Sequence, residues 1–145
     1  MVELRTITKD NLEDVLKLDV FDYQKSYVSS IAHSLAQAYV YRDTAFPFAI
    51  YTDEILVGFI MLGYYKEKKQ YTLWKLLIDR KHQNKGYGKD AVQKGITYLT
   101  DTFGAKEIYV GVSSENDRAK RLYTSIGFKA TGLIENNMEE MKTNC

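Results

Sequence analysis

The sequence is poor in several residue types, and each shortage excludes a class of protein. Among its 145 residues there is one cysteine, Cys145, so no disulfide can form within the chain and we expect a reducing compartment. The two histidines, His33 and His82, have no cysteine or histidine at metal-ligand spacing, so we predict no metal site. No apolar run approaches the roughly 20 residues that a membrane helix needs.

The remaining composition is typical of a globular protein. Hydrophobic residues make up 45% and charged residues 27% of the chain. Residues 1–5 lack the apolar core of a signal peptide, so we predict a cytoplasmic protein without a membrane partner. The length suits one domain, and no linker, repeat or low-complexity tract divides it. We therefore predict a single domain over residues 1–145.

The net charge of +1 hides an uneven distribution. Residues 66–94 contain nine Lys and Arg against three Asp and Glu, a balance of +6. Between Asp10 and Asp22 the balance reverses, with five acids against Lys17 alone. A basic centre suits a polyanionic small ligand and an acidic N-terminal region suits a cation, and we predict no nucleic-acid partner. The plainer alternative is that both regions are solvated surface.

The spacing of apolar residues predicts the order β-αα-ββ-β-α-β-α-ββ, an α/β fold with one parallel βαβ unit at the centre of its sheet. Residues 2–7 form the first strand, and the first helix runs from Leu12 to Val20, with Asp10 and Glu13 as a capping box. A second helix covers 28–39. Residues 71–79 are a central strand that is buried on both faces. After a helix that begins near Asp90, residues 106–112 return as a parallel strand.

A basic, glycine-containing loop, residues 83–89, lies between that central strand and the following helix. A strand, a tight glycine turn and a helix N-terminus in this order form an anion cradle, because unpaired backbone N–H groups and the helix dipole both favour negative charge. The loop therefore predicts a pyrophosphate site, with a plain surface turn as the alternative. Asp90 stands where a P-loop carries Ser or Thr, which excludes a P-loop NTPase.

Two motifs about 30 residues apart carry a family resemblance. Gln83–Gly88 has the Gln/Arg-x-x-Gly-x-Gly/Ala form of the acetyl-CoA loop of the GCN5-related N-acetyltransferases, and the downstream motif has matching spacing at Asn116, Ala119, Leu122, Tyr123, Gly127 and Phe128. The chain resembles that superfamily over essentially its whole length, and bacterial polyamine acetyltransferases most, through 24–28, 34–39 and 57–61. The resemblance implies a mixed, mostly antiparallel sheet.

The resemblance also implies a function and site residues. The function is direct acetyl transfer from acetyl-CoA to a small primary amine such as spermidine or spermine. The cofactor-binding residues would be Leu76, Leu77, Ile78, Gln83, Asn84, Lys85, Gly86, Tyr87, Gly88, Lys89 and Asn116. The first three would pair with the pantetheine arm and the loop amides would hold the pyrophosphate. Asn116 would form a hydrogen bond with the cofactor arm, cap a helix, or do both.

Tyr123 is the predicted catalytic acid, because a hydroxyl beside the CoA sulfur can protonate the departing thiolate. The alternative for Tyr123 is packing among Ala119, Leu122 and Ile126. An alkyl ammonium with a pKa of about 10 must lose a proton before it attacks. Some relatives use a glutamate on the fifth strand, but residues 108–112 contain none, so we assign no base.

Several choices stay open. Asp19 and Asp22 are predicted to bind the distal ammonium groups of the polyamine. Arg80, Lys81 or Lys120 would bind the 3′-phosphate of the CoA nucleotide. Alternative functions are acetylation of a protein N-terminus or an antibiotic amine, and a non-catalytic acyl-CoA sensor. A homodimer is compatible with the sequence.

Overall fold

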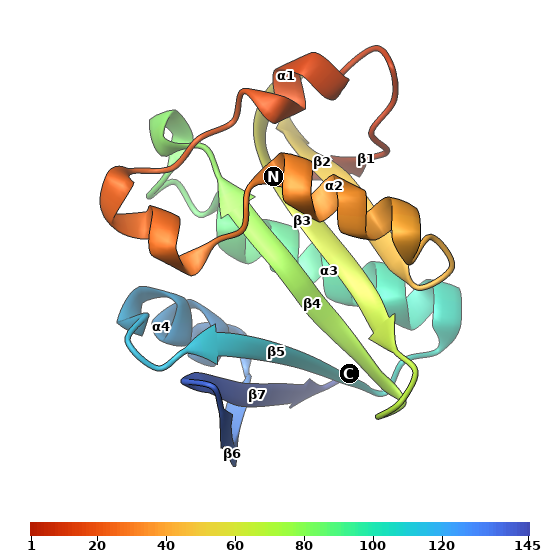
Figure 1. Cartoon of the computed structure of the whole chain (residues 1–145), viewed down its shortest axis with the longest axis vertical. Coiled ribbons are helices and arrows are strands. Elements are labelled where there is room, and N and C mark those ends of the chain that lie inside the picture. Colours follow the sequence, from red (N-terminus) through yellow and green to blue (C-terminus); the bar gives the residue numbers. More distant parts are fainter.

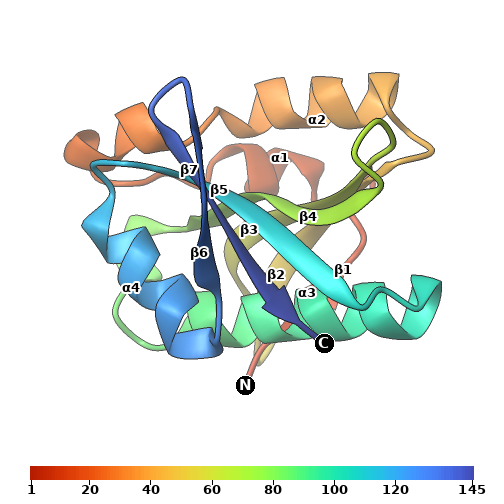
Figure 2. The same ribbon diagram turned by 90° about the horizontal axis from the view of Figure 1, so that it is seen from below.

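A computed structural model describes residues 1–145, which form one seven-stranded sheet with helices on both faces (Figures 1 and 2). The strands are β1 (Glu3–Arg5), β2 (Ala45–Thr52), β3 (Ile55–Tyr65), β4 (Gln70–Ile78), β5 (Glu107–Ser113), β6 (Lys129–Glu135) and β7 (Met138–Asn144). The helices are α1 (Leu12–Leu16), α2 (Ile31–Val40), α3 (Tyr87–Phe103) and α4 (Asp117–Ile126), with short 3₁₀ helices at Asp22–Tyr27 and Arg80–His82. None of the helices has the length and apolar character that crossing a membrane requires.

The sheet has the order β1-β2-β3-β4-β5-β7-β6. Only β4 and β5 pair in parallel, and every other neighbouring pair is antiparallel. The helix α3 makes the crossover between the two parallel strands. The predicted α/β class, element order and central βαβ unit are therefore confirmed.

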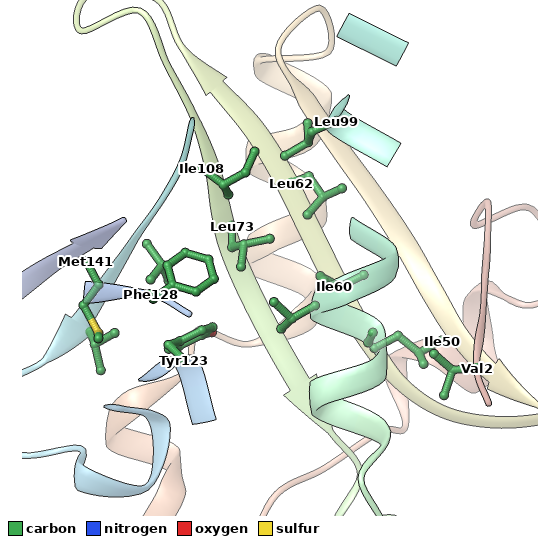
Figure 3. Close-up of a cluster of buried hydrophobic side chains, with 14 of the residues drawn as sticks. Val2, Ile50, Ile60, Leu62, Leu73, Leu99, Ile108, Tyr123, Phe128 and Met141 are labelled. Carbon is green, nitrogen blue, oxygen red and sulfur yellow. The ribbon is translucent and has the colours of Figure 1, made fainter. Parts of the chain in front are cut away.

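Two hydrophobic cores lie on opposite faces of the sheet. Figure 2 shows α1 and α2 along one face and α3 and α4 along the other. On the α2 face, Ile31 packs in one cluster with Phe59 and Leu77; on the α3 face, the cluster includes Leu73 and Leu99 (Figure 3). Because β4 contributes Leu73 to one cluster and Leu77 to the other, the prediction that this strand is buried on both faces is confirmed.

Close packing explains the glycine inside α3. A Cβ built on Gly95 would lie 3.0 Å from Leu62 Cδ2, on β3. That separation is tighter than a comfortable carbon–carbon contact of about 3.5–4.0 Å. Gly95 therefore lets the helix approach the sheet closely.

The first helix is shorter than predicted and starts differently. It ends at Leu16, because the Asp19 N–H donates to Asp79 Oδ1 at 2.9 Å and the Arg80 N–H donates to the Asp19 carbonyl at 2.7 Å. These bonds attach residues near 19 to the end of β4. The predicted capping box was wrong: Asn11 occupies the N-cap position, and no side chain caps the helix there.

The two parallel strands separate partway along their length. The β4–β5 pairing is confined to Tyr71–Leu73 opposite Ile108–Val110, and Figure 1 shows the strands diverging toward their carboxyl ends. Opposite β3, Met61 pairs with Lys75 and Leu62 with Leu73, so Trp74 is an extra residue in a bulge at this point. The carboxyl-terminal part of β4 consequently has a free edge facing β5.

Candidate active site

A cleft of about 470 Å³ opens where β4 and β5 separate. It is lined by the end of β4, the loop into α3, the start of α4 and the 22–28 region. The predicted cofactor-binding residues that line it are Leu76, Leu77, Ile78, Gln83, Asn84, Gly86, Tyr87, Gly88, Lys89 and Asn116. Lys85 is exposed on the same loop but does not line the cleft. The structure thus brings together residues that are up to 40 positions apart in the chain.

The glycine loop presents backbone amides to this cleft. The helix α3 starts at Tyr87, three residues earlier than predicted, after Gly86 with a φ of 83°. Its first helical bond runs from the Asp90 N–H to the Gly86 carbonyl at 3.1 Å, so the preceding amides have no partner within the helix. Asn84 has a φ of 64°, and asparagine and glycine tolerate this left-handed conformation best. Such a turn aims successive N–H groups at one point and suits an anion.

Side-chain amides and a guanidinium hold the loop in place. Gln83 Nε2 donates to the Ile78 carbonyl and to Gln24 Oε1, both at 2.9 Å, and Gln24 Nε2 donates back to Gln83 Oε1 at 3.0 Å. From α4, Arg118 donates to Gln83 Oε1 at 3.0 Å and to Asn84 Oδ1 at 2.9 Å. The loop is therefore tied to β4, to the 22–27 helix and to α4.

Arg118 was not predicted from the sequence, although its position near the start of a helix is a signal. Arg118 is the second residue of α4, where the helix dipole disfavours a cation. A cation at such a place indicates polar or anionic partners in front of the helix, and Gln83, Asn84 and the cleft lie there.

Asn116 caps α4 as its sequence context predicts. Its Oδ1 accepts a hydrogen bond from the Ala119 N–H at 3.2 Å. Its side chain also belongs to the lining of the cleft. The capping role is therefore observed, while the role toward a cofactor stays a prediction.

A second cavity of about 320 Å³ adjoins the cleft and reaches Tyr123. The two share the residues Tyr27, Val28, Leu76, Leu77, Asn116, Ala119 and Leu122, so they lie side by side. Tyr123 is only 6% exposed, and its ring packs edge-on against Phe128 with 5.4 Å between centroids (Figure 3). Burial raises the pKa of the Tyr123 hydroxyl, so it stays protonated at neutral pH. Tyr123 thus both packs in the core and faces a cavity.

The residues predicted to meet substrate charges lie at different places. Lys120 Nζ lies 2.7 Å from the Glu139 carboxylate and donates to the Ser114 carbonyl at 2.6 Å, whereas Arg80 and Lys81 are exposed.

The two acids predicted to bind the acceptor both lie near Lys25. The Asp22 side chain is 97% exposed and its carboxylate lies 3.1 Å from Lys25 Nζ, and the Asp19 carboxylate lies 3.9 Å from the same ammonium. Neither acid lines either cavity, although Tyr23 and Gln24 beside them line the cleft. No three His, Cys, Asp or Glu side chains gather in the geometry of a metal site.

Comparison with known proteins gives consistent matches. The family model described as Acetyltransferase (GNAT) family matches residues 12–128. The Spermine/spermidine N(1)-acetyltransferase of Bacillus subtilis is 31% identical over 149 aligned residues, which cover 97% of this chain and 95% of that protein.

Solved structures share the fold. A spermidine N-acetyltransferase from Vibrio cholerae, in complex with CoA and spermine, has a TM-score of 0.80 at 18% identity, over 99% of this chain and 95% of that one. A PaiA N-acetyltransferase from Thermoplasma acidophilum, in complex with coenzyme A, has a TM-score of 0.76 at 16% identity, and the match covers 100% of this chain and 99% of that one. The family match over most of the sequence and the relative aligned along nearly its whole length show that the chain belongs to the acetyltransferase (GNAT) family.

Proposed function

We propose that this acetyltransferase transfers an acetyl group from acetyl-CoA to a primary amine of a polyamine such as spermidine or spermine, in a ternary complex. One observation carries the proposal: the amide cradle at the start of α3 and the free edge of β4 line one cleft, which adjoins the cavity with Tyr123 and shares lining residues with it. The polyamine acceptor rests on the 31% identical relative.

The cleft fits the donor. Unpaired amides of residues 84–89 suit a pyrophosphate, with Lys89 and Arg118 supplying positive charge at the cleft. The free edge of β4 at 76–78 suits an extended amide-containing arm, which can pair with backbone groups as an added strand would. Bound acetyl-CoA supplies a thioester carbonyl that an amine can attack.

Tyr123 has the role of an acid. Its hydroxyl proton moves to the sulfur as the carbon–sulfur bond breaks, and the Tyr123 oxygen takes the proton that the acceptor nitrogen loses, so a neutral thiol and a neutral amide leave. The apolar surroundings that keep the hydroxyl protonated also disfavour a thiolate, because both anions lose their hydration in the same cavity. Asp19 and Asp22 have the role of attracting the distal ammonium groups toward the cleft.

The test is a thiol-release assay with a panel of amines: spermidine, spermine, an aminoglycoside and a peptide with a free N-terminus. We expect kcat/KM to be highest for the two polyamines. Turnover of the peptide or the aminoglycoside without turnover of either polyamine would overturn the acceptor assignment. Binding of acetyl-CoA without thiol release from any amine would instead indicate a non-catalytic sensor.

A further inference from the structure

Lys75 occupies the cavity that holds Tyr123, and no role has been given to it. It lies on β4 two residues beyond the last β4–β5 pair and immediately before the free edge at Leu76. Because a strand rises about 3.3 Å per residue, Lys75 stands roughly 7 Å past the point where the strands separate. Its ammonium donates to Ser29 Oγ at 2.7 Å and lies 5.7 Å from the centre of the Trp74 ring.

The surroundings of Lys75 contain no charge that compensates it. It is the one charged side chain among the residues that line this cavity, and no carboxylate lies within salt-bridge distance of it. The titratable groups that share the cavity are two tyrosines, Tyr27 beside the loop to α2 and Tyr123 on α4. The parts of β3, β5, β7 and α2 that line it contribute apolar residues, glycine or serine. Burial, with no opposing charge, lowers the pKa of the Lys75 ammonium.

Two amines cannot both carry a proton comfortably in this cavity. A polyamine enters as an ammonium, and its attacking nitrogen must lose a proton before it can form a bond to carbon. Two like charges in surroundings without a carboxylate repel each other, because no opposite charge offsets them. Binding of the acceptor therefore releases one proton, either from Lys75 or from the acceptor amine. Whether the reaction proceeds depends on which of these two amines is neutral.

We propose that Lys75 is the general base that takes the proton from the acceptor ammonium. The inference rests on the proposed polyamine acetylation. An N–H bond of the acceptor breaks, a bond between that hydrogen and Lys75 Nζ forms, and the freed electron pair on the acceptor nitrogen attacks the thioester carbon. Tyr123 protonates the leaving sulfur, and the second proton of the acceptor nitrogen returns to the Tyr123 oxygen as the amide forms. Lys75 then releases its proton toward solvent past Ser29, so each turnover yields one amide, one thiol and one proton.

A rival role for the same side chain is purely electrostatic. A permanently protonated Lys75 would lower the pKa of the acceptor amine by repulsion, without accepting a proton itself. Arginine separates the two roles, because it keeps the charge and the reach of lysine but does not deprotonate in proteins. Methionine keeps an unbranched apolar stem and removes the amine.

The experiment compares the wild type with Lys75→Arg, Lys75→Met and the exposed control Lys9→Met. The measurement is kcat/KM for spermidine against pH, at saturating acetyl-CoA. For the wild type we expect kcat/KM to rise with pH as Lys75 loses its proton, and to fall at higher pH as the free acceptor loses its own. The reason is that the productive pair is a neutral lysine with an ammonium. For both Lys75 variants we expect values lower by on the order of 10²-fold at neutral pH and a steady rise up to the acceptor pKa, because only free amine then reacts.

The outcomes are distinguishable. Retention of wild-type kcat/KM and profile in Lys75→Arg would overturn the base role, whatever Lys75→Met does. Because Lys75 does not line the cofactor cleft, all variants should keep the same increase in melting temperature with acetyl-CoA, which shows that they are folded. If the wild type acetylates no polyamine, the proposed function fails and this inference fails with it. If the wild type is active and Lys75→Arg is unimpaired, the inference alone fails.

Discussion

Removing one oxygen atom tests the role of Tyr123. Since Phe keeps the ring that packs edge-on against Phe128, Tyr123→Phe should leave the core intact and remove only the proton donor. We expect kcat for spermidine to fall by about 10²-fold, within the range for loss of an acid catalyst, with little change in the KM for acetyl-CoA. Steady-state kinetics with both substrates measure the two effects.

The matched control for that change is Tyr98→Phe. Tyr98 is half-buried on α3 and packs against Phe48, away from both the cleft and the cavity of Tyr123. It should keep wild-type kinetics. An unchanged kcat in Tyr123→Phe, when chemistry limits the rate, would remove Tyr123 from the acid role.

Arg118 supports a second residue-level prediction. Arg118→Gln loses the two bonds to Gln83 and Asn84 and one positive charge at the cleft. We expect the KM for acetyl-CoA to rise by roughly tenfold, equivalent to about 1.4 kcal/mol, with kcat nearly unchanged. The control Arg121→Gln changes an exposed arginine of the same helix and should have no effect. Equal KM values for the two variants would contradict a role of Arg118 in holding the loop or the donor.

At the residue scale, the sequence indicated those positions whose roles depend on local spacing. Asn116 was predictable because a cap is recognised from its own turn, and its bond to Ala119 is observed. The contacts of Arg118 and Lys75 depend on which distant segments meet them. Their partners, Asn84 and Ser29, lie 34 and 46 positions away, and no periodicity encodes such pairs.

At the scale of elements, the turn between β4 and α3 depends on the conformation of Gly86. A side chain at its φ of 83° is strained by about 1–2 kcal/mol, although no atom lies within 4 Å to obstruct it. Gly86→Ala should therefore either destabilise the loop or rotate its amides away from the cleft. We expect a KM for acetyl-CoA raised by on the order of tenfold and a melting temperature lowered by a few degrees.

Gly104→Ala is the control for that change. Gly104 also has a positive φ, 69°, with open space around it, and ends α3 far from the loop. It should lower the melting temperature by a similar amount without changing the KM for acetyl-CoA. If both variants keep the wild-type KM, the loop conformation does not matter for the donor.

The order of elements followed from the sequence because apolar periodicity records which faces are buried. The sequence predicted the ends of the helices and strands less accurately than their order. The helix pattern of 12–20 continues past Leu16, but Asp79 binds the Asp19 N–H and directs the chain elsewhere. The separation of β4 from β5 was also not predictable in detail, since it depends on a bulge at Trp74 and on pairing that stops at Leu73.

At the scale of the whole molecule, the uneven charge distribution should affect acceptor binding. Asp22→Asn removes a carboxylate from the acidic N-terminal region and frees Lys25 from its closest partner. We expect the KM for spermidine to rise by about two- to fivefold, a small effect because exposed charges are screened by solvent and salt. The rise should shrink as ionic strength increases. The control Asp43→Asn changes an exposed acid outside that region, which forms no ion pair, and should have no effect.

Acetyl transfer from acetyl-CoA to a polyamine yields one thiol for each acetylated amine, so the balance of products is the decisive measurement. The wild-type protein is incubated with acetyl-CoA and spermidine, and both free thiol and acetylated spermidine are quantified over time. We expect the two to appear at equal rates, and neither to appear when spermidine or the protein is left out. Thiol release without acetylated spermidine, or no release at all with either polyamine, would contradict the proposed reaction.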